Sequence, residues 1–223
     1  MRVKIITIDG PSGVGKGTLA EKLADYLGFH LLDSGALYRL TAINAKRLSL
    51  DPDNGKEAGQ AVDDLAVAFK RGKVFLHGQE VSQAIRSLEA GQLASRIAVH
   101  PVVREKLFSF MQDFVRPPGI VADGRDMGSV VFSGADLKLF LTAAAEVRAK
   151  RRYKQLKDNG KDVNLNDVFS ELIKRDGRDT SRQTAPLEPA KDAVVIDSGA
   201  LDVLQVFEKA KTLAALRGIV PHY

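Results

Sequence analysis

Short apolar runs alternate with stretches of helical periodicity along most of the chain. The apolar runs lie at residues 3–9, 31–33, 120–123, 137–141 and 194–197. Apolar residues recur every three or four positions at about 16–27, 34–47, 88–98, 101–115, 145–158, 165–176 and 202–214. Short apolar runs separated by helices are typical of a parallel sheet covered on both faces. The pattern predicts an α/β fold with a five-stranded parallel sheet flanked by helices.

The segment from about 51 to 86 departs from this alternation. Short β-like pieces lie at 67–69, 74–77 and 80–82, and the turn sequences Lys70-Arg71-Gly72-Lys73 and Gly78-Gln79 join them. Pieces this short, separated by glycine-containing turns, predict antiparallel pairing. We therefore expect a small antiparallel β insert in the α/β core.

Length and composition narrow the class of protein. A chain of 223 residues forms one α/β domain with insertions or at most two small domains. It has no run of 18 apolar residues and no N-terminal signal pattern, so we expect a cytoplasmic enzyme without a membrane partner. The chain has no cysteine, which excludes disulfides, thiolate catalysis and cysteine-based zinc sites.

The net charge of +5 leaves nucleic-acid binding open as one interpretation. The arginines gather between 148 and 182 and near the glycine-rich segments, and they form no unbroken basic tail. Small polyphosphate ligands would explain this clustering equally well.

The strongest motif directly follows the first apolar run. It reads Gly10-Pro11-Ser12-Gly13-Val14-Gly15-Lys16-Gly17-Thr18, and we call residues 10–18 the phosphate loop. Its glycines leave room for backbone N–H groups to surround a phosphate, and the next helix points its positive end at the same place. Lys16 would reach the β- and γ-phosphates, and the Thr18 hydroxyl would bind Mg²⁺. The alternative is an ordinary glycine-rich turn.

The position of Gly17 makes this motif more specific. The general pattern places Ser or Thr directly after the lysine, whereas here Gly17 separates Lys16 from Thr18. The Gly-Lys-Gly-Thr order resembles that of nucleoside monophosphate kinases of the adenylate kinase type.

Two further segments follow predicted strands. Ser34, Tyr38 and Arg39 begin the helix after the second run, where an aromatic ring and a guanidinium suit a ligand with a base and a phosphate. Asp123, Arg125 and Asp126 follow the third run, at a strand end that faces the ligand crevice of such sheets. Asp123 could lie near Mg²⁺ or its waters, and Arg125 could hold an acceptor phosphate. The alternatives are a surface helix and a structural Asp-Gly turn.

Two groups of arginines have helical spacing. They are Arg175, Arg178 and Arg182, interleaved with Asp176 and Asp179, and Arg148, Arg151 and Arg152. Either group could be a solvated helix face. Together, however, the groups supply more cations than one triphosphate needs, which favours phosphoryl transfer between two anionic substrates. The acceptor would itself be an ionised phosphate, so no strong general base is required.

Four segments together resemble bacterial cytidylate kinases, at residues 10–18, 32–39, 122–128 and 175–187. The resemblance covers nearly the whole chain, includes the β insert at about 60–86, and is most specific in Asp-Gly-Arg-Asp-Met-Gly at 123–128. It implies one P-loop kinase domain over 1–223, with a monophosphate-binding insert at about 51–100 and a lid at about 148–161.

The resemblance also implies the reaction. The enzyme would transfer the γ-phosphate of ATP to CMP or dCMP by direct in-line transfer with Mg²⁺, as part of pyrimidine nucleotide metabolism. It would be a cytoplasmic monomer without nucleic-acid or membrane partners.

The resemblance further implies a set of site residues. The phosphate loop would hold ATP, with Thr18 and, through water, Asp123 at the metal ion. Catalytic side chains would be Lys16, Arg125, Arg151, Arg152, Arg178 and Arg182. The CMP site would contain Ser12, Ser34, Tyr38, Arg39, Ser95, Arg104, Asp123, Arg125, Asp126, Arg175, Asp179 and Arg182. Of these, Ser34, Ser95, Arg104 and Asp126 are expected near the base, Asp179 near the ribose, and Arg39, Arg125 and Arg182 near the phosphate.

Three other classes of nucleotide-binding protein are alternatives to a cytidylate kinase. A regulatory GTPase would need an N-K-x-D motif, which the chain lacks. Adenylate and uridylate kinases share the phosphate loop but should lack the insert and the 123–128 segment. A nucleic-acid-binding ATPase would show salt-dependent binding to RNA or DNA. The preference among CMP, dCMP and UMP stays open.

Overall fold

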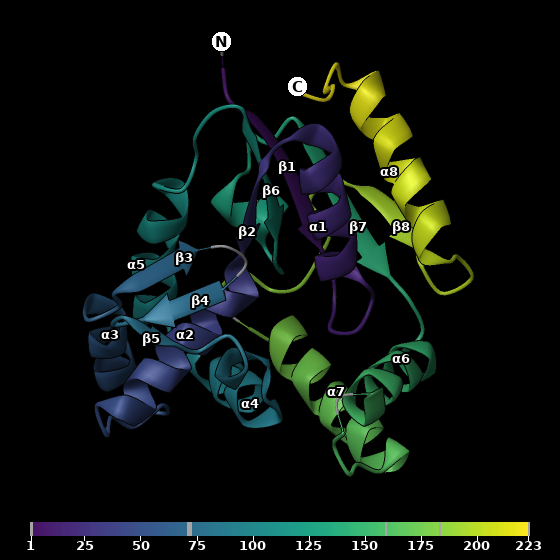
Figure 1. The fold of residues 1–223 in the computed structure, drawn as a ribbon. Coiled ribbons are helices and arrows are strands. Elements are labelled where there is room, and N and C mark those ends of the chain that lie inside the picture. The colour runs from purple at the N-terminus through teal and green to yellow at the C-terminus, as the bar shows by residue number, and fades with distance from the viewer. Residues whose placement is uncertain (1, 71–72, 159, 183, 223) are drawn as a thin grey trace. The chain divides into compact units, whose positions relative to one another are not determined.

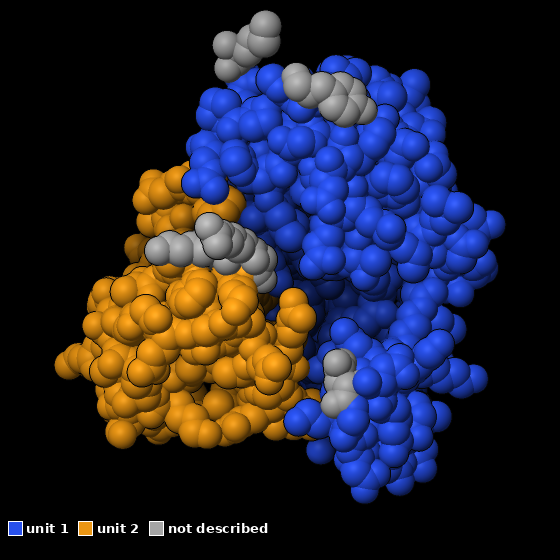
Figure 2. Space-filling view, in the orientation of Figure 1, with its two compact units in different colours: residues 1–33, 115–223 blue, residues 34–114 orange. Residues whose placement is uncertain are grey.

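The computed structural model describes residues 2–70, 73–158, 160–182 and 184–222 (Figure 1). The chain divides into two compact units, one formed by residues 1–33 with 115–223 and the other by residues 34–114 (Figure 2). Among the described residues, no helix is both long and apolar enough to cross a membrane.

The first unit contains the parallel sheet that the apolar runs predict. Its strands are β1 (Lys4–Asp9), β2 (His30–Asp33), β6 (Gly119–Asp123), β7 (Leu137–Thr142) and β8 (Val194–Asp197). They lie in the order β2-β6-β1-β7-β8, and every neighbouring pair is parallel. The predicted five-stranded sheet is therefore confirmed, with β1 in its centre.

The register of the sheet brings carboxylates to one edge. Ile8 and Asp33 both lie opposite Asp123, while Asp9 lies opposite Phe140. The strands β1, β2 and β6 therefore all end in an aspartate at the same edge. The phosphate loop leaves the sheet from this edge, directly after Asp9.

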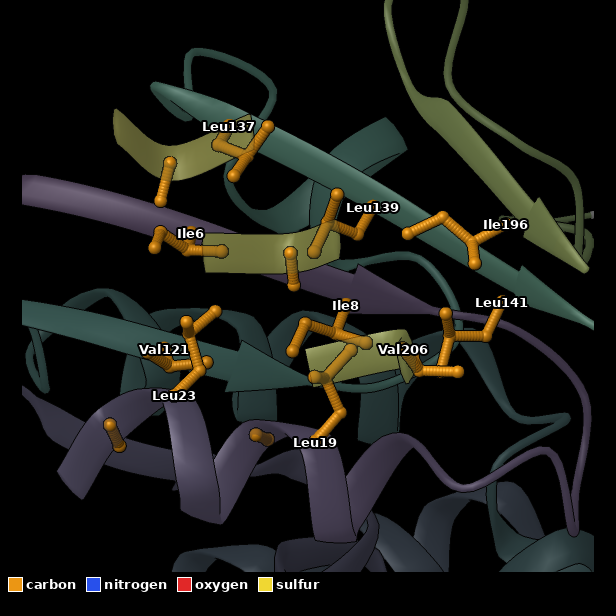
Figure 3. Packing of buried hydrophobic residues seen from close by; sticks show 14 of the residues in the cluster. Ile6, Ile8, Leu19, Leu23, Val121, Leu137, Leu139, Leu141, Ile196 and Val206 are labelled. Carbon is orange, nitrogen blue, oxygen red and sulfur yellow. The ribbon is translucent and has the colours of Figure 1, made fainter. Parts of the chain in front are cut away.

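Two helices cover one face of the sheet. They are α1 (Lys16–Leu27) and α8 (Val203–Leu216). Ile6 and Ile8 pack with Leu19 and Leu23 of α1 in a fully buried core, and Val206 of α8 joins them (Figure 3). Each such side chain contributes about 1.5–3 kcal/mol by burial. Since side chains alternate along a strand, Thr7 and Asp9 of β1 face the opposite side of the sheet.

The remaining helices of this unit are α6 (Ala145–Asp158), α7 (Leu165–Thr180) and a short π-helical turn, η2 (Met127–Val131). The helix α7 extends four residues beyond the predicted end at 176. The sequence did not predict η2, because five residues are too few to show a helical period. The proposed lid at 148–161 falls on α6 and the turn after it, and residue 159 lies outside the described residues.

The second unit contains the predicted β insert and helices around it. Its strands are β3 (Val67–Lys70), β4 (Lys73–Leu76) and β5 (Gln79–Glu80), and its helices are α2 (Ser34–Arg47), α3 (Gly55–Asp63), η1 (Ala84–Arg86), α4 (Leu88–Ile97) and α5 (Pro101–Gln112). The strands pair antiparallel in the order β3-β4-β5, as predicted. Residues 71 and 72 of the expected turn lie outside the described residues.

The sequence missed two helical elements of the second unit, the short turn η1 and the longer helix α3. The helix α3 lies inside the segment that showed only β-like pieces, and Asn54 caps its start by accepting from the N–H groups of Lys56 and Glu57. Its buried face consists mainly of small residues, including Ala58, Gly59 and Ala61. Small residues give a weak hydrophobic period, so the sequence pattern did not reveal this helix.

Candidate functional site

The phosphate loop depends on glycines that a side chain could not replace. Gly10 has φ +145°, and a Cβ there would lie 2.2 Å from the carbonyl oxygen of Leu141. Gly15 has φ +97° and caps the N-terminus of α1. L-residues with a Cβ rarely adopt such φ values. The loop therefore closes tightly against β7 and delivers the positive end of α1 to its own concave side.

Lys16 and Asp123 face one another behind the loop. The Lys16 Nζ donates a hydrogen bond to the Pro11 carbonyl at 3.0 Å and lies 4.0 Å from Asp123 Oδ1. The lysine is only 6% exposed. Burial lowers the pKa of Lys16 and raises the pKa of Asp123, because it disfavours both charged forms. A phosphate that binds here would favour the protonated, charged form of Lys16. A bound cation would favour the ionised form of Asp123.

The first turn of α1 offers oxygen ligands for a hard cation. A Cβ on Gly17 would lie 3.5 Å from Asp123 Oδ2, so this carboxylate lies beside the turn that also carries Thr18. A hydroxyl and a carboxylate are the donor types that Mg²⁺ prefers. Among the described residues, no three or more His, Cys, Asp or Glu side chains gather as a metal site. Any divalent ion at Thr18 and Asp123 would thus take further ligands from phosphates or water.

Asp179 joins two of the predicted arginines into what we call the arginine cluster. Arg125 Nε donates to Asp179 Oδ2 at 2.9 Å, and Arg182 Nη2 donates to Asp179 Oδ1. Asp179 is 2% exposed. Burial opposes its charged form, but the charges of Arg125, Arg182 and Arg175 outweigh that effect and hold the pKa of Asp179 at about 2. The cluster is thus a buried cationic centre with one fixed anion.

Arg148 supports the phosphate loop from behind, a role that the sequence did not reveal. Its Nε donates to the Ala143 carbonyl at 2.9 Å, and its Nη1 donates to the Ser12 carbonyl at 3.2 Å. The same Nη1 lies 2.7 Å from Asp176 Oδ2 on α7. Arg148 therefore connects the loop with α6 and α7. In the sequence it looked like part of a basic helix face.

Ser198, after β8, is a second supporting residue that the sequence did not single out. Its hydroxyl donates to the Val14 carbonyl at 2.9 Å. Arg151 in turn donates to the Ser198 carbonyl at 2.6 Å and to its Oγ at 3.2 Å. Arg151 thus contacts the loop through Ser198.

The structure does not bring the other two predicted catalytic arginines to the arginine cluster. Arg152 Nη1 donates to Gln155 Oε1 at 2.7 Å along its own helix. Arg178 Nη2 lies 3.7 Å from Glu171 Oε1, two turns earlier on α7. These two contacts lie within α6 and within α7.

Asp126 lies at the start of η2, buried beside the strand end of β6. The two N–H groups that follow it, from Met127 and Gly128, donate to the carboxylate of Asp9. Asp9 was not among the predicted site residues. Its position at the end of an apolar run was the only sequence signal.

The second unit holds the other predicted residues on three helices. Ser34, Tyr38 and Arg39 lie on α2, Ser95 on α4 and Arg104 on α5. The Arg104 guanidinium lies over the Tyr38 ring, 5.8 Å from its centre, so these two side chains come together as a cation–π pair. Arg39 Nη1 donates to the Ile85 carbonyl at 2.7 Å.

Ser95 is the most suggestive residue of this unit. It is 4% exposed, and its Oγ has no hydrogen-bond partner among the described residues. Buried hydroxyls nearly always have a partner, because leaving one unpaired costs about 1–3 kcal/mol. A ligand group would satisfy this hydroxyl.

Comparison with known proteins gives a consistent result over almost the whole chain. The model of the cytidylate kinase family matches residues 6–215. The cytidylate kinase of Cupriavidus pinatubonensis is 49% identical over 216 residues, which cover 96% of this chain and 98% of that one. That of Pseudomonas entomophila is 49% identical over 222 residues, covering 97% of both chains. That of Shewanella denitrificans is 48% identical over 214 residues, covering 93% of this chain and 94% of the relative.

Among solved structures, an uncharacterized protein from Eubacterium ventriosum has a TM-score of 0.50 and 14% identity, covering 96% of this chain and 99% of its own. That likeness concerns the fold alone.

Proposed function

Since the chain belongs to the cytidylate kinase family, we propose that it transfers the γ-phosphate of ATP to the phosphate of CMP or dCMP in one direct step. A kinase of this family uses ATP together with a divalent metal ion, and we propose that the ion is Mg²⁺. The observation that carries the proposal is the presence of two anion-binding centres in one unit. The phosphate loop with Lys16 suits a triphosphate, and the arginine cluster supplies further buried cations for an acceptor.

In the proposed reaction, an oxygen of the CMP phosphate attacks the γ-phosphorus in line with the departing oxygen of ADP. A phosphate oxygen is already ionised near neutral pH, so no side chain has to remove a proton. Arg125 and Arg182 would hold the attacking phosphate, while Lys16 would neutralise charge on the transferred group. Bound Mg²⁺, held by Thr18 and through water by Asp123, would supply additional charge neutralisation at the phosphate oxygens.

We propose that Arg151, Arg152 and Arg178 complete this neutralisation when α6 and the turn after it close over ATP. The contacts of Arg152 and Arg178 support such a movement. Arg152 and Arg178 bond to Gln155 and Glu171, which are surface side chains that cost little to leave. Closure would also exclude water, which otherwise competes as the acceptor.

We also propose which side chains recognise the cytidine moiety. Ser34, Ser95, Arg104 and Asp126 would read the base, supported by the buried, unpartnered hydroxyl of Ser95. Tyr38 would hold Arg104 in place through the cation–π pair. Asp179 would bind a ribose hydroxyl, since each carboxylate oxygen has a second lone pair beyond the one taken by an arginine. Ser12, Arg39 and Arg175 would complete the CMP site.

A coupled assay of ADP formation tests the proposal. The wild-type enzyme should phosphorylate CMP and dCMP, should act on UMP more weakly, and should leave AMP near background. A preference for AMP, or no activity with CMP, would overturn it.

We further propose that the enzyme acts as a monomer in the cytoplasm.

The variant Arg182→Ala tests the role of the arginine cluster. Turnover should fall by at least about a hundredfold, because a buried donor to the acceptor phosphate is lost, while ATP binding stays nearly unchanged. Arg217→Ala is the matched control, since Arg217 is exposed and donates only a long bond of 3.4 Å to the Asp136 carbonyl. Near-normal turnover of Arg182→Ala at saturating CMP would contradict the assignment.

A further inference from the structure

Asp9 is a buried carboxylate at the junction of β1 and the phosphate loop. It is 5% exposed and directly precedes Gly10. Its Oδ1 accepts a hydrogen bond from the Met127 N–H at 2.8 Å, and its Oδ2 accepts one from the Gly128 N–H at 2.7 Å. Such short bonds from two consecutive amides are the strong, charge-assisted kind.

These bonds fix one end of a short arch. At the other end, the Gly124 N–H donates to the Ile8 carbonyl at 3.0 Å. Arg125 and Asp126 are therefore the two residues between attachments to β1, one made by Ile8 and one by Asp9. We call residues 124–127 the acceptor arch. Its geometry depends on both attachments.

Gly128 shows how closely the arch is drawn to β1. A Cβ at this position would lie 2.7 Å from Thr7 Oγ1 and 3.3 Å from Asp9 Oδ2. A side chain there would push the segment away from the strand. The carboxylate and the glycine therefore act together to hold the same piece of backbone.

We propose that Asp9 is a positioning residue that fixes Arg125 and Asp126 for the acceptor nucleotide. This inference rests on the proposed function, in which these two side chains contact CMP. Asp9 itself contacts backbone amides, so it acts through the arch. Its backbone leads into the phosphate loop, whereas its side chain holds only the acceptor arch.

The electrostatics of Asp9 support a functional reason for its presence. Burial raises the pKa of Asp9 to about 6, even though the amides of Gly128 and Met127 favour the charged form. Because the folded pKa is the higher one, the ionised carboxylate of Asp9 lowers the free energy of unfolding of the protein above about pH 6. Groups held at such a cost are typical of functional sites.

The variant Asp9→Asn tests the proposal. Asparagine offers one acceptor oxygen and an NH₂ group, so one of the two amides loses its acceptor. We expect the KM for CMP to rise about tenfold or more, as the loss of one charge-assisted bond implies, and the KM for ATP to stay within about twofold. Amide exchange at Met127 and Gly128, followed by NMR, should accelerate about tenfold.

Asp136→Asn is the matched control. Asp136 accepts from the Ile5 N–H at 3.0 Å and from Lys4 Nζ at 2.9 Å, so the same substitution removes one bond of a similar pair at the opposite end of β1. It should change neither KM nor the exchange at Met127 and Gly128. A KM for CMP within about twofold of wild type in folded Asp9→Asn would overturn the proposal. Equal increases in both KM values would also overturn it, since they indicate general damage.

Gly128→Ala tests the same arch without altering Asp9. It should raise the KM for CMP, and adding Thr7→Ala should lower it again in part, because the nearest clashing atom is removed while Lys138 Cδ at 3.2 Å and Asp9 Oδ2 at 3.3 Å remain. An unchanged KM in Gly128→Ala would overturn the role of the arch. Failure of the wild type to phosphorylate CMP would overturn the proposed function, whereas unchanged amide exchange in Asp9→Asn would overturn the positioning role by itself.

Discussion

Replacing Asp179 by asparagine should destabilise the protein measurably, because its carboxylate is the only anion bonded to both arginines of the cluster among the described residues. Arg125 Nε lies 2.9 Å from Oδ2, and Arg182 bonds to Oδ1. Asparagine has nearly the same shape, so the substitution removes the charge with little change in packing. The two guanidinium groups would stay buried without their shared counter-charge, and only the charges of Asp123 and Asp176 would still act on Arg125.

The magnitude follows from the pKa of Asp179. That pKa is about 2 in the folded protein, against an ordinary value of 3.8. A shift of roughly two units corresponds to about 2.5 kcal/mol of stability near neutral pH. Because the folded pKa is the lower one, this contribution is present above about pH 4 and is lost as the pH falls towards about 2.

Urea denaturation followed by circular dichroism measures this effect. Near neutral pH, the free energy of unfolding of Asp179→Asn should be about 2.5 kcal/mol below that of the wild type. At about pH 3 the difference should shrink to roughly half, because the wild-type carboxylate is then partly protonated in the unfolded chain. Glu171→Gln on the same helix is the control, since its 3.7 Å pair with Arg178 is about one-third exposed and should change stability by less than about 0.5 kcal/mol.

Two results would refute this reasoning. One is a loss of less than about 1 kcal/mol near neutral pH, which would mean that the arginines do not depend on Asp179 for charge compensation. The other is a difference between variant and wild type that does not change with pH, which would assign the loss to packing.

Two further predictions concern the phosphate loop and the second unit. Arg148→Met removes the bonds to the Ser12 and Ala143 carbonyls, so the KM for ATP in steady-state assays should rise about tenfold or more, and Arg217→Met should leave it unchanged. An unchanged KM in Arg148→Met would contradict its supporting role. Ser95→Ala should weaken CMP binding about fivefold or more in calorimetric titrations, while the free energy of unfolding should stay the same or rise by about 1 kcal/mol, because an unpaired buried hydroxyl is removed. Equal affinities of the wild type and Ser95→Ala for CMP would contradict a role of Ser95 at the cytosine base.

Much of the fold follows from local signals in the sequence. The strands β1, β6 and β7 are buried on both faces, so they appear as continuous apolar runs, and their ends are predicted to within one residue. The helix α3 was missed because its contact with α5 uses a small residue. A Cβ on Gly59 would lie 3.3 Å from Val102, which shows that close approach rather than bulky side chains defines this contact.

In the candidate site, too, some features could be predicted from the sequence and others could not. The phosphate loop could be predicted because nine consecutive residues carry its whole signal, including the glycines that need positive φ. The proposed supporting roles of Asp9, Arg148 and Ser198 could not be predicted. Each of these side chains bonds to a backbone N–H or carbonyl group more than a hundred residues away, and a backbone group leaves no signal in the sequence. In sequence, Arg148 is indistinguishable from Arg152, although one bonds to the loop backbone and the other to Gln155.

The central place of β1 in the sheet has a consequence for synthesis of the chain. On the ribosome β1 emerges before both of its neighbours, because Lys4 pairs with Gly119 and Ile6 with Leu137, and these partners appear only after residues 34–114 have been made. Until then its apolar side chains and free edge stay exposed, which invites association with other chains or with chaperones. Pairing between such distant segments is also slow. The strand that carries the phosphate loop therefore waits for partners more than a hundred residues later in the chain before it can be ordered.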